Sequence, residues 1–427
     1  MFKSDNILVV INKLIIGVYL CSSVAYCDIL IRDVTVIDVV KGTTTPKRSI
    51  LIHGDRIVTL GGEIAAARHA EIVNGAGKFV LPGFWDMHVH LTRRDELPLY
   101  PAYGVTGVRD MGSDYERVKA WRTDVEKSQF VGPHIETCGP LVDGFPSSDP
   151  NLPVKMIRSP AEARALFDRL DGQQVDFIGV SSRLPREAYF ALIERARKYY
   201  SLVAGDVPAT VSVMEAIDAR QKSIEHMSGI LLACSTEERR LREPLTLALE
   251  RGDLDGFRQA ESIAFDTFSP QKADVLFERM ARFETRSVPI LVKLRVSPYE
   301  KGLYEKLTQV LMRMQRNGVA IMAGTDSGEP GTHPGEELHQ ELELLVAAGL
   351  TPAQALRSAT VEPAKYIGAD EKLGAVAQGR VADLVLLDAN PLVDIRNTRK
   401  IDGVVIGGKY FSKIRLNALR GQRVAQK

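Results

Sequence analysis

Eight short apolar segments alternate with helix-like segments through the middle of the chain, and this alternation is the strongest constraint on its fold. The apolar segments begin near Phe84, Thr106, His134, Asp176, Leu202, Ser223, Ser287 and Ala320. Strands that alternate with helices are typical of βα units and a parallel sheet. Residues 84–367 allow about 35 residues for each of eight units, which suits a (β/α)8 barrel with insertions. We therefore predict an α/β fold, a TIM-like (β/α)8 barrel over residues 82–367.

The longest connection in this region lies between the sixth and seventh predicted strands. Residues 235–284 are polar and rich in helix-forming residues. We expect this insertion to form a lid or an outer helical layer.

Both flanks of the barrel region are rich in strands instead. Residues 28–81 alternate apolar and polar side chains, and Gly54-Asp55 marks a tight hairpin. Residues 381–387 and 404–411 have the same character. We predict that residues 28–81 and 368–420 pack together as one small composite β-sandwich.

The first 27 residues have the three-part pattern of a secretory signal. Lys3 and Lys13 precede the apolar run Leu14–Leu20, and small residues that end at Ala25 follow it. The uncharged part, Leu14–Ala25, is shorter than the ~20 residues that a membrane span requires. We predict a signal peptide over residues 1–27, cleaved after Ala25 or alternatively at Cys27, export to the periplasm or the medium, and no stable membrane insertion afterwards. Asp5 weakens the positive region, so a buried N-terminal segment or a misplaced start codon stays an alternative.

The charge balance limits the class of partner. Lys and Arg number 55 against 54 Asp and Glu, a formal net charge of +1. A general nucleic-acid binder needs a basic surface, so no nucleic-acid partner is expected. Four cysteines in 427 residues also exclude a disulfide scaffold.

Two histidines lie two residues apart at the end of the first strand. His88 and His90 stand in Phe84-Trp-Asp-Met-His-Val-His90. A strand period of two places both imidazoles on one face, here the barrel interior, where they can bind one cation. Active sites of such barrels lie at the C-terminal ends of the strands, which favours a metal site over buried histidines that merely bond to the backbone.

Two further residues end later strands. Asp326 follows the eighth strand in Ala323-Gly-Thr-Asp-Ser-Gly328, where a carboxylate can bind the metal and take a proton from water. A turn or helix-cap aspartate is the alternative. His226 ends the sixth strand, either as a core histidine or as a group at the barrel mouth.

Six short motifs, spread over nearly the whole mature chain, together carry a resemblance to a known family. They are Val80–His90, Gly107–Gly112, Ser223–His226, Ala323–Gly328, Ser358–Ala364 and Gly379–Leu387. Together they resemble the metal-dependent amidohydrolase superfamily, in its branch of imidazolonepropionase-like and prolidase-like (Xaa-Pro dipeptidase-like) enzymes. The resemblance implies a distorted barrel with a composite β-sandwich built from both chain ends.

Two positions depart from the pattern of this branch. Its members usually carry a lysine at the end of strand four, carboxylated to bridge two metals, and a histidine at the end of strand five. Here these positions are Gly179 and Asp206. Without the bridging carbamate, little anionic charge offsets the repulsion between two dications. We therefore expect one divalent metal, with zinc as the expected ion, and no second metal.

The resemblance also implies roles for the remaining residues. His88, His90 and Asp326 are the expected metal ligands, Asp206 is a further oxygen ligand, and His226 is either a ligand or an acid and base. The implied activity is hydrolysis of an amide, peptide-like or cyclic C–N bond in a small substrate such as a dipeptide. A metal-activated water attacks, with Asp326 as the general base.

The two departures leave other functions open. A degenerate barrel would bind a ligand without turnover, and a single-metal deaminase or cyclic-amide hydrolase would use a similar site.

Lys293, after the seventh strand, could supply a cation or a substitute carbamate, although a solvated lysine is the default expectation. Arg109 and Asp110 are expected to pair with each other under the barrel mouth. Members of the superfamily are often multimers, so a homo-oligomer is also open.

Overall fold

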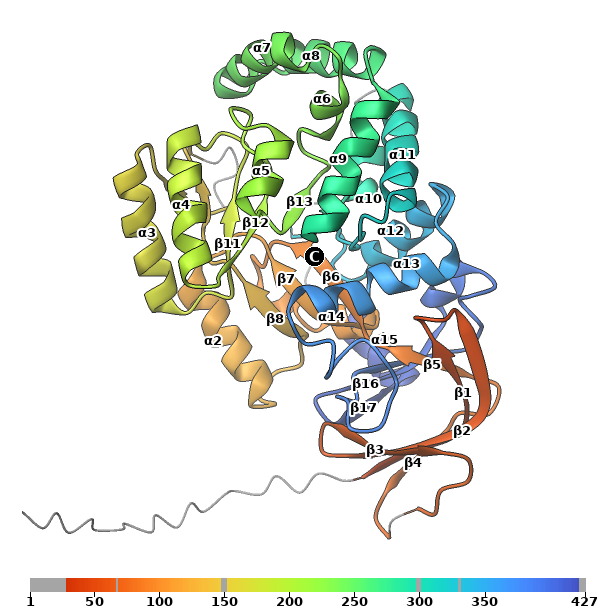
Figure 1. Ribbon diagram of the computed structural model, residues 1–427. Helices are drawn as coiled ribbons and strands as arrows, with labels where there is room; N and C mark the ends of the chain where they lie inside the picture. Colours follow the sequence, from red (N-terminus) through yellow and green to blue (C-terminus); the bar gives the residue numbers. More distant parts are fainter. Residues whose placement is uncertain (1–27, 67, 147–151, 297–300, 329–331, 422–427) are drawn as a thin grey trace, which may run out of the picture.

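The computed structural model describes residues 28–66, 68–146, 152–296, 301–328 and 332–421. These residues form a barrel surrounded by helices, with a separate sheet below it in Figure 1. The predicted α/β fold, a TIM-type barrel with sheet segments from both chain ends, is confirmed. The predicted signal peptide, residues 1–27, lies outside the described residues.

The barrel strands form two parallel groups. The first group runs in the order β6 (Phe84–Val89), β7 (Val105–Asp110) and β8 (His134–Thr137). The second runs in the order β10 (Val154–Met156), β9 (Leu141–Asp143), β11 (Phe177–Val180), β12 (Leu202–Gly205), β13 (Ser223–Glu225) and β14 (Arg286–Val288). Every residue of β6, β7 and β11 is buried, as expected for strands covered on both faces.

The eighth predicted strand is not a regular strand, which corrects the sequence prediction. The segment that follows Ala320 closes the barrel through isolated parallel bridges, Ser287 with Ile321 and Val89 with Ser327. Asp326 within it has a φ of 60°, in the left-handed region. Such a residue cannot continue a strand, so the ladder is interrupted where a site residue turns.

Helices surround the barrel, line its mouth and, in the case of α15, pack against β16 and β17 of the terminal sheet. They are α1 (Leu99–Ala102), α2 (Tyr115–Glu126), α3 (Pro160–Gln173), α4 (Arg186–Lys198), α5 (Val213–Ala219), α6 (Ile230–Cys234), α7 (Glu238–Arg251), α8 (Leu254–Asp266), α9 (Pro270–Phe283), α10 (Leu291–Val296), α11 (Lys301–Arg316), α12 (Glu336–Ala347), α13 (Pro352–Ser358), α14 (Val361–Tyr366) and α15 (Lys413–Gly421). Short 3-10 turns span Arg94–Glu96 and Ile395–Arg399. Within the described ranges, no helix combines the length and apolar character that a membrane span needs.

Residues 235–284 fold into helices, as the sequence indicates. Helices α7, α8 and α9 occupy this insertion, and α7 and α8 lie at the end of the molecule opposite the β1–β4 sheet (Figure 1). Local sequence signals set the helix starts: Ser269 accepts a hydrogen bond from the backbone N–H of Lys272, and Pro270 takes the first helical position of α9.

Both chain ends contribute to one eight-stranded sheet. Its main order is β17 (Lys409–Ser412), β16 (Ile401–Ile406), β15 (Leu384–Leu387), β5 (Phe79–Pro82), β1 (Ile29–Asp38), β2 (Thr43–His53) and β3 (Arg56–Gly61), and β4 (Glu71–Asn74) pairs with β1. The β2–β3 turn contains Gly54-Asp55, so the hairpin predicted there is confirmed. Antiparallel pairing of β5 with β15 joins the two ends, and β5 leads directly into β6 of the barrel.

Candidate metal and active site

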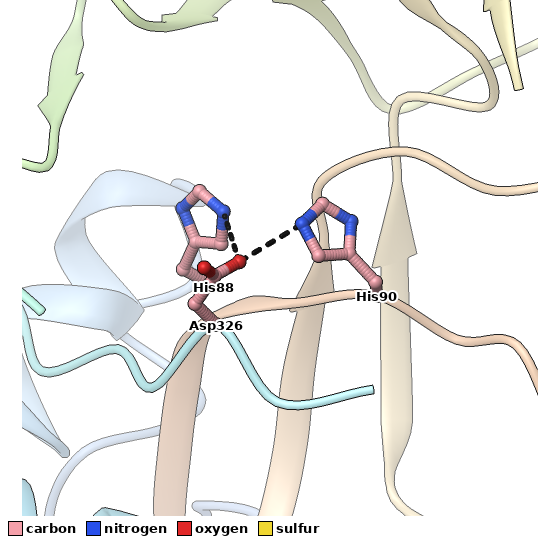
Figure 2. Close-up of side chains that lie close together, drawn as sticks. All are labelled: His88, His90 and Asp326. Carbon is pink, nitrogen blue, oxygen red and sulfur yellow. Dashed lines mark ion pairs between the residues drawn. The ribbon is translucent and has the colours of Figure 1, made fainter. Parts of the chain in front are cut away.

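Three residues from the first strand and the closing segment converge inside the barrel. His88 lies on β6, His90 follows it, and Asp326 lies on the closing segment. Nε2 of His90 is 3.0 Å and Nε2 of His88 is 3.4 Å from Oδ1 of Asp326. Figure 2 marks both contacts with dashed lines. Their possible ligand atoms all lie within 4.8 Å of one another, and the three side chains are buried. Two imidazoles and a carboxylate are donors that zinc accepts, so these residues fit one divalent metal.

A buried network behind His88 sets the orientation of its ring. Nδ1 of His88 lies 2.9 Å from Oε2 of Glu225, at the end of β13. Glu225 also accepts hydrogen bonds from Nη2 of Arg109 (2.8 Å) and from the hydroxyl of Ser223 (2.6 Å). Burial would raise the pKa of Glu225, but the Arg109 charge and the contacts with His88 and Ser223 lower it to about 2. The carboxylate thus holds Nδ1 and directs Nε2 toward Asp326, as in the carboxylate–histidine–metal arrangement.

This network corrects one prediction and adds a residue. Arg109 pairs with Glu225, whereas Asp110 accepts hydrogen bonds from the backbone of Leu91 and the hydroxyls of Ser113 and Thr137. Arg109 and Asp110 are adjacent on one strand, so their side chains point to opposite faces and cannot meet. Sequence reasoning missed Glu225. The signal was its spacing of two from Ser223, which places both side chains on the same face of β13.

The environment of Asp326 keeps its carboxylate ionised. Burial would raise the pKa of this carboxyl, but its polar contacts with the His226, His88 and His90 rings outweigh burial and hold it well below its usual range. His226 also has a left-handed φ, of 55°. Backbone conformations of this kind cost energy in a non-glycine residue and cluster at functional sites.

His226, Asp206 and Lys293 lie beside the three-residue metal group. The His226 and His88 rings are 4.9 Å apart, and Nε2 of His226 lies 3.9 Å from Oδ2 of Asp326. Asp206 contacts His226 instead, with 3.0 Å between Oδ1 and Nδ1. Nζ of Lys293 lies 3.2 Å from Oδ2 of Asp326, so this lysine is not the solvated residue that the sequence favours.

Gly179, where the family resemblance leads us to expect the bridging lysine, has no room for a side chain. A Cβ atom at Gly179, on β11, would lie 2.7 Å from Sγ of Cys138 and 2.9 Å from Cδ2 of Leu141. Real Cβ atoms do not approach so closely, and Cys138 is fully buried. Neighbouring side chains thus fill the space that the lysine stem would use.

A cavity of about 350 Å³ opens beside this group. Lys293, His226 and Asp206 contribute to its wall next to Asp326. The rest of the wall is mainly apolar, from the segment after β12 and from helices α5 to α8 and α11, including Val207, Val213, Leu231, Leu245, Phe257 and Leu307. The predicted insertion therefore covers the site partly, through α7 and α8. One acid in this wall, Glu261, has its pKa raised to about 7 by burial.

Comparison with known proteins identifies the family. Residues 102–410 match the amidohydrolase family. The chain belongs to this family. It is 23% identical to the 5'-deoxyadenosine deaminase of Methanobrevibacter smithii, over 81% of this chain and 80% of that protein. It is 25% identical to the imidazolonepropionase of Sphingopyxis alaskensis, over 78% of this chain and 84% of that protein.

A solved structure shares the fold of this amidohydrolase. A Xaa-Pro dipeptidase with bound methionine in its active site matches with a TM-score of 0.70 and 21% identity, over 90% of this chain and 100% of that chain. The predicted membership of the amidohydrolase superfamily is confirmed, and so is the prediction of an enzyme; the relatives are hydrolases that act on C–N bonds. The family is metal-dependent and its members act on small molecules.

Proposed function

We propose that this amidohydrolase cleaves a C–N bond of a small substrate at one divalent metal, expected to be zinc, held by His88, His90 and Asp326. The observation that supports it most is the buried group formed by these three residues, with Glu225 behind His88. The closed position at Gly179 supports a single metal, because no carbamate from that strand is available to bridge two.

The side chains around the metal group divide the proton transfers between them. His88, His90 and Asp326 would hold a divalent metal, which would supply a Lewis acid for activating water at neutral pH. Asp326 accepts the proton of the attacking water and returns it to the leaving amine. Asp206 holds Nδ1 of His226, so Nε2 of this ring faces Asp326. From there His226 serves either as a fourth ligand of the metal or as an acid and base.

The cavity beside the site supports an amide or dipeptide-like substrate with an apolar group. Leu231, Leu245 and Phe257 offer it an apolar wall, while Lys293 and His226 lie at the end next to Asp326. An apolar wall with a few polar groups is the usual form of a small-molecule site. We propose that the apolar group occupies this cavity while the C–N bond lies at Asp326.

Deamination is the second candidate, and the similarity to a 5'-deoxyadenosine deaminase favours it. A deaminase releases ammonia from its substrate, whereas a peptidase or amidase releases an amino acid or amine. One screen that scores both products on dipeptides, N-acyl amino acids and aminopurine nucleosides distinguishes the two.

Metal content is the first experiment. The purified protein is dialysed, offered zinc or manganese at neutral pH, and analysed by elemental mass spectrometry. About one tightly held equivalent is expected, followed by turnover in the screen. A protein that retains no metal would contradict the proposal and leave a ligand-binding barrel without turnover.

We also propose that residues 1–27 direct export to the periplasm or the medium. The pattern of an apolar run followed by small residues supports this proposal. Intact mass of the protein recovered from the periplasm or medium tests it, and a full-length cytoplasmic product would contradict it.

A further inference from the structure

The carboxylate of Asp326 has two sides that face different partners. Oδ1 lies 3.0 Å from His90 and 3.4 Å from His88, on the side of the proposed metal. Oδ2 lies 3.2 Å from Nζ of Lys293 and 3.9 Å from Nε2 of His226. One carboxylate therefore joins the metal group to a lysine ammonium.

Lys293 reaches this carboxylate from the segment that follows the seventh strand. It lies on α10, just after β14, and its side chain is 35% exposed and lines the cavity. A lysine in an amphipathic surface position directs its ammonium to water. Here the ammonium lies against the carboxylate of the metal group, at the border between that group and the cavity.

The surroundings offer a second dication little compensation for its charge. The strand-four position is filled by Cys138 and Leu141 at Gly179, and the Asp206 carboxylate is bonded to His226. Two dications close together repel strongly unless an anion bridges them. An ammonium has half the charge of a dication and needs no further ligands to bind Oδ2 of Asp326.

We propose that Lys293 is the second cation of this site, bound to Asp326 where a second metal ion would otherwise bind. The inference rests on the proposed single-metal function. Lys293 acts as a positioning residue, because it fixes the Asp326 carboxylate so that Oδ1 faces His88 and His90.

This role has a consequence that packing alone would not produce. Lys293 and the metal share one carboxylate, so the two cations repel each other. Even with the screening of bulk water, a unit charge a few ångströms from a dication changes its binding by about tenfold. Removing the charge should therefore tighten metal binding, because the bound metal itself holds Oδ1, and should slow turnover, because Oδ2 loses the ammonium that orients it.

The test compares the wild-type protein with Lys293→Gln, Lys293→Arg and Arg295→Gln. Arg295 is exposed on the same helix and serves as the matched control. Zinc affinity is measured by competition with a chelator, zinc content by elemental mass spectrometry, and kcat on a substrate from the screen. We expect one zinc per chain throughout, zinc binding at least about tenfold tighter in Lys293→Gln, and a kcat about 100-fold lower. Lys293→Arg and Arg295→Gln should keep the wild-type zinc affinity.

Three results would overturn the inference. Wild-type zinc affinity in Lys293→Gln would show that the ammonium does not act on the metal group, and would leave the proposed function intact. Weaker zinc binding in Lys293→Gln, with two bicarbonate-dependent zinc ions in the wild-type protein, would show that Lys293 is a carboxylated ligand. A wild-type protein without zinc would defeat the proposed function and the inference together.

Discussion

The two halves of the barrel mouth differ in how completely their side chains are supported. On the side of β6 and the closing segment, His88, His90 and Asp326 converge, and Glu225 holds His88 from behind. On the side of β11 and β12, Gly179 has no side chain and Asp206 contacts His226. The comparison teaches that the three proposed metal ligands can all come from the first half, while their supports come from elsewhere: Glu225 on β13 holds His88, and His226, which contacts Asp206, lies beside Asp326.

Removing Asp326 should have the largest effect on this comparison. Asp326→Asn removes both a metal ligand and the proposed base, so we expect kcat to fall by at least about 10⁴-fold and zinc retention to fall with it. Steady-state kinetics and elemental analysis measure the two effects. Asp370→Asn, at an exposed aspartate, is the control. Activity within tenfold of wild type in Asp326→Asn would contradict the assignment of Asp326 as metal ligand and general base.

The support of His88 should matter next. Glu225→Gln leaves Nδ1 of His88 without its carboxylate, and loss of such a partner weakens metal binding by about 10–100-fold. Chelator competition measures the zinc affinity. The change also leaves Arg109 buried without its anion, which typically costs about 3–5 kcal/mol of unfolding free energy.

A double variant separates the two effects of this change. In Glu225→Gln combined with Arg109→Met, the buried charge is gone while His88 still lacks its partner. We expect the stability to recover partly in chemical denaturation and the zinc affinity to stay low. Wild-type zinc affinity in either variant would show that the first half does not need Glu225.

Asp206 should affect rate without affecting the metal. Asp206→Asn weakens the hold on Nδ1 of His226, and we expect kcat to fall by about tenfold at unchanged zinc affinity. This loss is smaller than the ~10²–10⁴-fold contribution of a positioned acid–base group, because the His226 ring itself stays in place. Zinc should also raise the melting temperature of this variant as it does for the wild type. Loss of zinc binding would instead show that Asp206 is a metal ligand, as the sequence predicts. The metal site would then use ligands from both halves of the barrel mouth.

Much of the barrel, and the convergence of His88, His90 and Asp326, could be predicted from the sequence. Strand period and position relate His88 to His90, and strand ends of a barrel meet at one rim, which brings Asp326 to them. The contact of Lys293 with Asp326 was not predictable in this way. It depends on the path of a loop and a short helix, and on a lysine stem whose direction no periodicity fixes.

The interruption of the eighth strand could not be predicted from the sequence either, because it too depends on contacts between distant parts of the chain. Apolar residues after Ala320 have the composition of a strand, but the left-handed turn at Asp326 depends on contacts made by the folded barrel. Glu225 was overlooked because a buried acid beside a histidine has no meaning until Arg109 is placed against it.

The smallest expected effect is on stability, from a substitution at Gly179 in the second half of the barrel mouth. Gly179→Ala adds a Cβ that would lie 2.7 Å from Sγ of Cys138, so we expect a loss of about 1–2 kcal/mol of unfolding free energy from overpacking. In a Cys138→Ala background the loss should shrink by at least about 0.5 kcal/mol, since residues in contact are coupled. Chemical denaturation of the four proteins of this cycle measures the coupling. A position with free space would instead be stabilised by about 0.4–1 kcal/mol, because alanine restricts the unfolded chain. That result would mean that the second half could still accept a longer side chain, and that the absence of a lysine at position 179 is not fixed by the packing of the barrel.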